Sequence, residues 1–372
     1  MSYSYLVVGS GIGKAIARWL AEQSDTELVT IVDRDKALLK IAPLFDSLDS
    51  KKIQYIVSDI DKLNQAELFK EFDVIISALP ARKNVELAFS AITAGVNFCD
   101  LGGVLEITRK IKNFHELAVA NRVSIVPDCG LMPGDGNIIA QDLIYQGYNY
   151  SAQVLVGGLP QNPQPPLFHS NPYSIEGLRH ICFDKALVLK NGEVQFAKAL
   201  SEYEEMMIPE LAKFSDRFKG RAETFITAGT STAPELFQRQ GLRYFSELTI
   251  RWPGFVKFVK TLTRDNFIEV MTPLLPAVNA SNPDLVYMEV TASGYKGDQV
   301  VEKSVRLLDL FDHQTELTAM ERTTGFSAAI MARMIAQGKI EKGVFTPESA
   351  LNREGVSEFC NELKKYFKIT ES

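Results

Sequence analysis

Residues 1 to about 128 alternate short apolar runs with longer amphipathic segments, and this alternation is the feature that most constrains the fold. The apolar runs, typical of buried strands, are YLVVG (5–9), ELVTIVD (27–33), IQYIVSD (53–59), DVIISAL (73–79) and VSIVPD (123–128). The segments between them, typical of helices, are GKAIARWLAEQ (13–23), KALLKIAPLF (36–45), QAELFKEF (65–72), NVELAFSAITAG (84–95) and LEITRKIKNFHELAVAN (105–121). Repeated strand–helix–strand units require right-handed crossovers and a doubly wound parallel sheet. The sequence therefore predicts an α/β fold with an N-terminal Rossmann domain over residues 1–128.

The pattern changes after PDCGLMPGDG (127–136), where a second domain is expected. One strand, YSAQVLVGGLP (150–160), precedes a stiff proline-rich connector. Later come long alternating runs of β-branched residues: LRYFSELTIRW (242–252), DLVYMEVTASGY (284–295) and QVVEKSVRLLDLF (299–311). Such runs are typical of antiparallel strands with one face buried. We expect a second α/β domain with a mainly antiparallel sheet over 129–316, and a C-terminal helix and tail, 317–372, returning to the Rossmann domain.

The composition of the chain indicates which classes of binding partner are expected. The 372 residues carry 40 Lys plus Arg and 46 Asp plus Glu, a net charge of −6, which disfavours nucleic acid as the main partner. No run is long and apolar enough to span a membrane, and MSYSYLVVGS lacks the cationic start of a signal peptide. The four cysteines have no zinc-like or redox spacing, and the four histidines form no metal-binding pair. These features predict a cytoplasmic protein with reduced thiols and without a metal.

A glycine-rich turn follows the first predicted strand. Gly9 and Gly11 fit the dinucleotide fingerprint Gly-x-Gly-x-x-Gly, but Gly13 comes one position early, and Lys14 occupies the place of the third glycine. Glycines between a strand and a helix N-terminus let the backbone approach a pyrophosphate. We therefore predict a cofactor-binding segment with Gly9, Ser10, Gly11, Ile12 and Gly13, although a lone glycine turn can also be purely structural.

The ends of the next strands strengthen the cofactor prediction. Asp33 lies about 20 residues beyond the turn, where an acid binds the adenosine ribose and repels a 2′-phosphate. This position favours NAD, while Arg34 beside it leaves NADP possible. Further candidates lie along the same carboxyl edge: Asp59, Ala78 and Leu79.

Several polar residues are candidates for the reaction, each with a structural alternative. Asp128 ends the last Rossmann strand and is expected to be a general acid/base, an amine anchor or a structural residue; Asp100, one strand earlier, we interpret as a helix cap. Thr230 and Thr232 flank Ser231 in a turn that could receive a carboxylate or begin a helix. Arg251 and Arg322 are candidates for clamping a substrate carboxylate, or for structural ion pairs. The roles of the remaining polar candidates are left open: His169, His180, Tyr173 and Lys185.

Taken together, the motifs resemble the saccharopine dehydrogenase family, and most closely its lysine 6-dehydrogenase branch. The motifs that carry the resemblance, in the family's order, are DLGG, PDCGLMPGDGNI, VGGLPQNPQPPL, SIEGL, GTST, LRY and TAM.R. Met132 and Val156 stand where saccharopine reductases tend to carry Asp and Cys, which favours the lysine branch. Departures from that branch are the shortened glycine turn, the AGTST loop, Ala81 and the segment FHSNPYS (168–174).

The resemblance implies a homodimer and an NAD(P)-dependent oxidoreductase that acts on a C–N bond of a small amino-acid substrate. The reaction it implies is oxidative deamination of L-lysine at the 6-amino group to the semialdehyde. Two alternatives stay open: a saccharopine or carboxynorspermidine-type dehydrogenase, and a non-catalytic dinucleotide-binding regulator.

Overall fold

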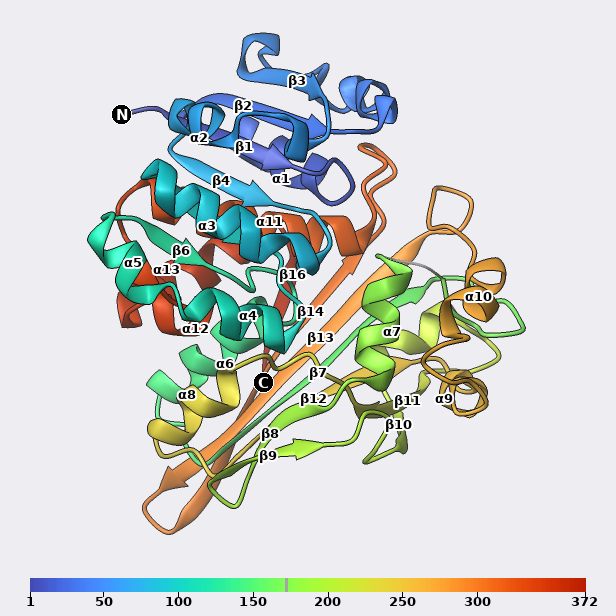
Figure 1. Ribbon diagram of the computed structural model, residues 1–372. Coiled ribbons are helices and arrows are strands. Elements are labelled where there is room, and N and C mark those ends of the chain that lie inside the picture. The colour runs from blue at the N-terminus through green and yellow to red at the C-terminus, as the bar shows by residue number, and fades with distance from the viewer. Residues whose placement is uncertain (171–172) are drawn as a thin grey trace. The chain divides into compact units, whose positions relative to one another are not determined.

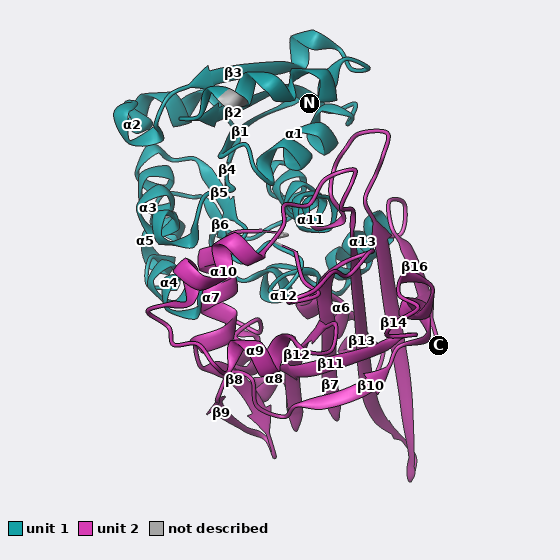
Figure 2. Ribbon diagram, turned by 90° about the vertical axis from the view of Figure 1, so that its right-hand side faces the viewer, with its two compact units in different colours: residues 1–135, 321–363 teal, residues 136–320, 364–372 magenta. Residues whose placement is uncertain are grey.

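The computed structural model describes residues 1–170 and 173–372, so part of the FHSNPYS segment lies outside the described residues. Figure 1 labels the helices and strands along the chain. The chain forms two compact units, which Figure 2 shows in teal and magenta. Unit 1 contains residues 1–135 and 321–363, and unit 2 contains residues 136–320 and 364–372. Two of the three boundaries between the units lie within helices, α6 (Asp135–Tyr145) and α11 (Ala319–Ala336), and the third follows Leu363. None of the helices among the described residues has the length and apolar character needed to cross a bilayer.

Unit 1 is built on a parallel sheet of seven strands in the order β15-β6-β5-β4-β1-β2-β3. Its strands are β1 (Tyr3–Val8), β2 (Thr26–Asp33), β3 (Ile53–Val57), β4 (Val74–Ser77), β5 (Asn97–Asp100), β6 (Ser124–Val126) and β15 (Gly343–Val344). Its remaining helices are α1 (Gly13–Ala21), α2 (Gln65–Leu68), α3 (Asn84–Ala94), α4 (Leu105–Lys112), α5 (His115–Ala120), α12 (Pro347–Ala350) and α13 (Arg353–Leu363). All four residues of β4 are buried, as expected for a strand covered on both faces.

Unit 2 contains a nine-stranded mixed sheet in which β12 and β7 are parallel and the other described pairs are antiparallel. Its strands are β7 (Ser151–Pro160), β8 (Ala186–Lys190), β9 (Glu193–Ala197), β10 (Glu204–Met207), β11 (Arg221–Ile226), β12 (Tyr244–Arg251), β13 (Asp284–Lys296), β14 (Gln299–Leu310) and β16 (Lys368–Glu371). Its short helices are α7 (Ile175–Phe183), α8 (Ala233–Arg239), α9 (Phe255–Val259) and α10 (Phe267–Met271). The predicted fold class, a Rossmann domain followed by a second α/β domain with a mainly antiparallel sheet, is confirmed.

Three local expectations differ from the structure. Residues Lys36–Phe45, expected as an α-helix, form a 3₁₀ helix containing Pro43, which lacks the N–H that an α-helix interior needs. The segment 105–121 forms two helices, α4 and α5, in place of one. The C-terminal tail, expected to return to the Rossmann domain, instead ends in β16, which pairs with β14 in unit 2.

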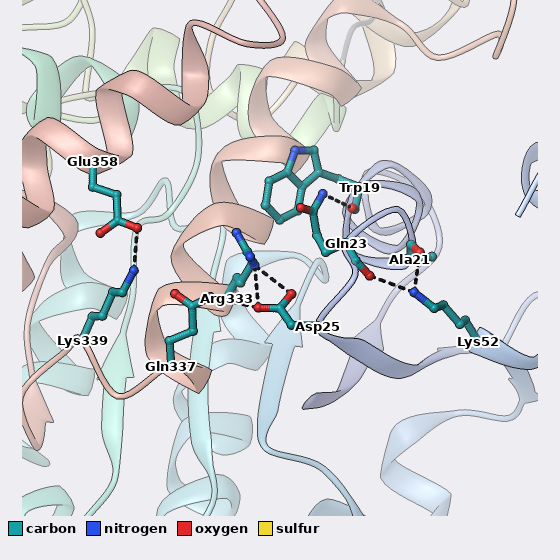
Figure 3. A network of polar contacts seen from close by, with 9 residues as sticks. All are labelled: Trp19, Ala21, Gln23, Asp25, Lys52, Arg333, Gln337, Lys339 and Glu358. Atoms are coloured by element: carbon teal, nitrogen blue, oxygen red, sulfur yellow. Dashed lines mark hydrogen bonds and ion pairs between the residues drawn. The ribbon is translucent and has the colours of Figure 1, made fainter. Parts of the chain in front are cut away.

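Helix α11 packs against α1 within unit 1. A Cβ atom on Gly325 would lie 2.9 Å from the Ala15 Cβ, so the two helices are in close contact there. At the other end of α11, the Arg333 Nε donates to both carboxylate oxygens of Asp25, at 2.9 and 3.0 Å (Figure 3). Gln337 donates to the same carboxylate. These contacts hold the late helix against the first βα unit.

Candidate functional site

The glycine turn joins β1 to α1 by close backbone packing. Gly9 has a φ of +100°, and a Cβ atom there would lie 3.0 Å from the Ala78 carbonyl oxygen and from the Leu79 Cδ2. A Cβ atom on Gly13 would lie 2.8 Å from the Val7 Cγ1, which is the close helix–strand packing usually assigned to the third glycine. The shortened spacing therefore preserves both the tight turn and the approach of α1 to β1.

The backbone of the same turn is suited to binding an anion. Among the described residues, the amide N–H groups of Gly11, Ile12 and Gly13 have no hydrogen-bond acceptor. Gly11 is exposed, and a Cβ atom there would meet nothing within 4 Å. Unpaired amides at a helix N-terminus, with open space in front of them, fit the pyrophosphate of a dinucleotide.

Asp33 is fixed beside this turn at the end of β2. Its Oδ2 accepts hydrogen bonds from the Ser10 amide and the Ser10 hydroxyl, both at 2.7 Å, and its Oδ1 accepts from the Asp35 amide at 2.9 Å. Burial opposes ionisation, but these hydrogen bonds outweigh it and lower the pKa of Asp33. A negative charge therefore stands where the adenosine ribose is expected, while Arg34 is exposed.

The cofactor candidate Asp59 and Lys14, which follows the glycine turn, both have local partners. Asp59 follows β3 and caps a short 3₁₀ helix by accepting from the Asp61 amide at 3.2 Å. The Nζ atom of Lys14, at the place of the missing third glycine, lies 2.8 Å from the Glu321 Oε1 on α11. The charge of Lys14 is therefore paired within the protein.

Asp100 and Asp128 lie together at the carboxyl edge of unit 1. The Asp100 Oδ1 accepts from the amides of Gly102, at 2.7 Å, and Asp128, at 3.2 Å, and its Oδ2 is buried without a partner among the described residues. Burial, followed by repulsion from Asp128, raises the pKa of Asp100 to about 8. The helix-cap interpretation of Asp100 was wrong, because the N-cap of α4 is Val104 and Asp100 joins two strand ends instead.

Asp128 is 1% exposed and has a φ of +71°, a conformation that non-glycine residues rarely adopt. Its Oδ1 accepts from the Thr108 hydroxyl at 3.0 Å and from the Gly103 amide at 3.4 Å. A Cβ atom on Gly102 would lie 2.0 Å from that same oxygen, so position 102 of the DLGG motif has no room for a side chain beside this carboxylate. Backbone strain at a buried acid is a feature of functional sites.

Glu348, in the short helix α12 after β15, is a third buried acid that the sequence did not reveal. The Thr346 hydroxyl donates to its Oε1 at 2.6 Å, and its Oε2 is buried without a partner among the described residues. Burial raises the pKa of Glu348 to about 7, and the charge of Asp128 raises it further while Lys112 opposes the shift. Its position after a two-residue strand gives no pattern by which sequence reasoning could have found it.

The raised pKa of Glu348 predicts a stability that depends on pH. An unfolded glutamate has a pKa near 4.5, so the native state binds the proton more tightly, and the free energy of unfolding falls as the pH rises through 7. A shift of this size corresponds to about 3 kcal/mol. We expect Glu348→Gln to raise Tm at about pH 9 by several degrees and to change it little at about pH 5. The exposed Glu358→Gln is the control in thermal unfolding; equal Tm shifts at both pH values would contradict the prediction.

Unit 2 contains a second buried polar group centred on Arg251, the last residue of β12. Arg251 is 3% exposed; its Nη1 donates to the Ile250 carbonyl oxygen at 2.7 Å and its Nη2 to the Tyr173 hydroxyl at 3.4 Å. The Nε atom is buried and has no partner among the described residues. The Cζ atom lies 5.5 Å from the centre of the Phe255 ring. The guanidinium thus retains an unused donor.

Glu247 lies on the same face of β12 as Arg251, since the two are four residues apart on a strand. Its carboxylate accepts from the hydroxyls of Thr227, at 2.6 Å, and Thr249, at 2.9 Å. Burial raises the pKa of Glu247 to about 7, although these hydrogen bonds and the charge of Arg251 oppose the shift. The alternating strand pattern suggested a solvent-facing polar side here, which is why the sequence did not reveal Glu247.

Of the candidates whose roles were left open, His169 and Tyr173 adjoin Arg251. Burial and the charge of Arg251 lower the pKa of His169, and burial raises the pKa of Tyr173 to about 12. His180 is held elsewhere, with its Nδ1 2.7 Å from the Asp184 Oδ2. Lys185 is exposed.

The remaining candidates have structural partners. The Thr230 hydroxyl, expected to receive a substrate carboxylate, donates to the Leu187 carbonyl oxygen at 2.6 Å, which corrects that expectation for this hydroxyl. Thr232 occupies the N-cap position of α8. The guanidinium of Arg322, on α11, lies 5.4 Å from the centre of the Phe326 ring. Within residues 1–170 and 173–372, no group of three or more His, Cys, Asp or Glu side chains is arranged to hold a metal ion.

The doubly wound sheet, the glycine turn and the acid after β2 are typical of a protein that binds a dinucleotide, and the family model of this region indicates a nicotinamide dinucleotide. Residues 5–126 match the family model of the saccharopine dehydrogenase NADP binding domain, and residues 130–369 match that of the saccharopine dehydrogenase C-terminal domain. The chain belongs to the saccharopine dehydrogenase family, an oxidoreductase family that acts on amino acids.

Three solved structures are similar to this chain to different degrees. Apo saccharopine dehydrogenase (L-Glu forming) from Saccharomyces cerevisiae is similar over 100% of both chains, with a TM-score of 0.76 and 16% identity. C. glutamicum DAP dehydrogenase in complex with DAP matches with a TM-score of 0.47 and 13% identity, over 98% of this chain and 99% of that chain. Amine dehydrogenase from Mycobacterium smegmatis matches with a TM-score of 0.45 and 8% identity, over 95% and 97%. At 16% identity, the similarity to the first of these structures concerns the fold alone.

Proposed function

We propose that this chain is an NAD-linked dehydrogenase that oxidises L-lysine at C6, releasing the 6-amino group and giving the semialdehyde. A bound nicotinamide ring supplies the hydride acceptor. The 6-ammonium group first gives a proton to a base, and the carbon that bears the amine then loses a hydride and becomes an iminium carbon. Water adds to this carbon, and ammonium departs to leave the aldehyde. The proposal also includes a homodimer, as the family resemblance implies, and a cytoplasmic location, as the scattered cysteines indicate. Light scattering of the purified protein measures the oligomeric state.

The observation that carries the proposal is the buried, incompletely paired guanidinium of Arg251. A buried cation with an unused N–H is costly unless an acceptor pairs with it. A carboxylate matches the fork of a guanidinium better than any neutral group. Arg251 is therefore the residue to which we assign the α-carboxylate of the substrate, and Thr232 and Arg322 remain further candidates.

We assign cofactor binding and acid/base chemistry to residues of unit 1. The amides of Gly11, Ile12 and Gly13 would hold the pyrophosphate, and Asp33 the adenosine ribose. We assign Asp128 as the acid/base or the anchor of the amine. Its neighbour Asp100, with a pKa of about 8, is a second buried acid that can hold a proton near neutral pH.

The charge of Asp33 predicts a preference for NAD over NADP. We expect Asp33→Asn to lower the ratio of kcat/KM for NAD to kcat/KM for NADP by about tenfold or more, because removing the carboxylate removes its repulsion of a 2′-phosphate. Steady-state kinetics with both cofactors measure this ratio. Arg34→Ala is the matched control, which should weaken NADP use and spare NAD. An unchanged ratio in Asp33→Asn would show that Asp33 does not determine the preference for NAD over NADP.

A saccharopine-type dehydrogenase is the second candidate, and one observation favours it. Its substrate carries an additional carboxylate, which requires another cation. The Nε atom of Arg179, on α7, is buried without a partner among the described residues. Arg179 lies three residues before Cys182, whose pKa responds to the charge of Arg251. Arg179 is thus a possible second carboxylate ligand for a larger substrate.

The deciding experiment is an assay of the purified protein for reduction of NAD and NADP with L-lysine and, separately, with saccharopine at alkaline pH. Turnover of L-lysine with NAD supports the proposal. Turnover of saccharopine alone assigns the second candidate. Cofactor binding without turnover of any amine would instead identify a non-catalytic dinucleotide-binding regulator.

A further inference from the structure

His169 is a buried histidine of unit 2. The side chain is 3% exposed, and neither Nδ1 nor Nε2 has a hydrogen-bond partner among the described residues. The ring packs edge-on against Phe255, with the ring centres 5.0 Å apart and the planes at 71°. A buried histidine with no partner is unusual, because buried polar groups in folded proteins are nearly always paired.

The same phenylalanine links His169 to Arg251. The Arg251 Cζ lies 5.5 Å from the centre of the Phe255 ring, and the Arg251 Nε is also buried without a partner. Burial and the nearby guanidinium lower the pKa of His169, so the imidazole is neutral at physiological pH. A neutral imidazole has one N–H donor and one acceptor nitrogen. The cluster therefore holds two unused donors, on Arg251 and His169, and one unused acceptor, on His169.

An α-amino acid carries the complementary set of groups on adjacent atoms. Its α-carboxylate can accept from the Arg251 donor, and its α-ammonium can donate to the His169 acceptor. A carboxylic acid without the amino group would leave the imidazole acceptor unpaired. We propose that His169 is a specificity-determining residue that binds the α-amino-acid end of the substrate, accepting a hydrogen bond from its ammonium while the Arg251 N–H group donates to its carboxylate.

This assignment rests on the proposed function only in placing the substrate carboxylate at Arg251. A ligand-binding role and a purely structural role for His169 predict different results when the residue is replaced. A histidine needed only for packing on Phe255 could be replaced by phenylalanine without effect on ligand choice. If the unused nitrogens exist for a ligand, the same replacement removes unpaired buried polar atoms, which costs the folded state little.

The test is calorimetric binding of L-norleucine and of hexanoate to the protein with NAD⁺ bound. These two probes differ only in the α-amino group, and neither has a 6-amino group to oxidise. We expect the wild type to bind L-norleucine about tenfold to a hundredfold more tightly than hexanoate, the effect of one unpaired buried polar group. In His169→Phe the preference should fall by about tenfold or more, with Tm unchanged or raised.

The control is His313→Phe, because His313 also packs edge-on against a phenylalanine, Phe311, at 5.0 Å, but is exposed. It should keep the wild-type preference. The proposal is overturned if His169→Phe keeps the preference for L-norleucine, or if the wild type binds hexanoate as tightly as L-norleucine. A protein that discriminates the probes through His169 but does not oxidise L-lysine would remove the proposed reaction and leave this inference standing.

Discussion

Replacing Arg251 with lysine should raise KM for the amino-acid substrate by about tenfold to a hundredfold, with a small change in kcat. Lysine keeps the positive charge but loses the fork that binds a carboxylate with two N–H groups. A loss of one or two charge-assisted hydrogen bonds accounts for an effect of this size. The α-carboxylate is remote from the reacting C6, so its binding energy is shared by ground state and transition state, and KM changes more than kcat.

Arg264→Lys is the matched control for this variant. Arg264 is also an arginine of unit 2, but its side chain is 44% exposed and pairs with Asp184 at the surface. Its replacement should leave KM unchanged. A measurement of Tm accompanies the kinetics, since Arg251 also donates to the Ile250 carbonyl oxygen. A folded Arg251→Lys protein with wild-type KM would remove Arg251 from the substrate site.

The second large effect is expected at Gly11. The position has open space around it and no positive φ, so Gly11→Ala should leave the free energy of unfolding within about 0.5 kcal/mol of wild type. The added methyl group would stand in front of the free amides where the pyrophosphate binds. We expect the Kd for NAD, measured by fluorescence titration, to rise about tenfold or more, equivalent to about 1.4 kcal/mol.

Gly13→Ala should behave in the opposite way. Its Cβ atom would lie 2.8 Å from the Val7 Cγ1, so the helix or the strand must shift. Overpacking of this kind costs about 1–3 kcal/mol, and chemical denaturation measures it. Weak cofactor binding in both variants with no loss of stability in Gly13→Ala would mean that the turn is more adaptable than its packing suggests.

The sequence predicted the framework of unit 1 because buried parallel strands are continuous apolar runs, as in Val74–Ser77. A glycine at a helix C-terminus, such as Gly95 with a φ of +74°, also marks the end of a helix in the sequence. The sequence did not predict β15, because two residues carry no periodicity. It also did not predict β16, whose exposed, polar sequence forms a strand only by pairing with β14. Both depend on contacts distant in sequence.

The site was predicted in a similar way. Residues at strand ends, such as Asp33 and Asp128, are candidates because the carboxyl edge of a parallel sheet concentrates binding residues. Glu247 was missed because a glutamate on an alternating strand is typical of a solvent-facing position, whereas this one is 1% exposed. His169 was recognised as a candidate, but its unpaired nitrogens and its contact with Phe255 depend on the tertiary fold.

The pairing of β15 with β6 has a consequence for synthesis on the ribosome. β6 ends at Val126, and the strand that covers its outer edge ends at Val344, 344 − 126 = 218 residues later. At about 5–20 residues per second, that edge is unprotected for roughly 10–40 s while the rest of the chain emerges. Open strand edges are sites of aggregation. A nascent chain of this protein should therefore depend on chaperones chiefly during that interval, and truncations before residue 343 should be prone to aggregate.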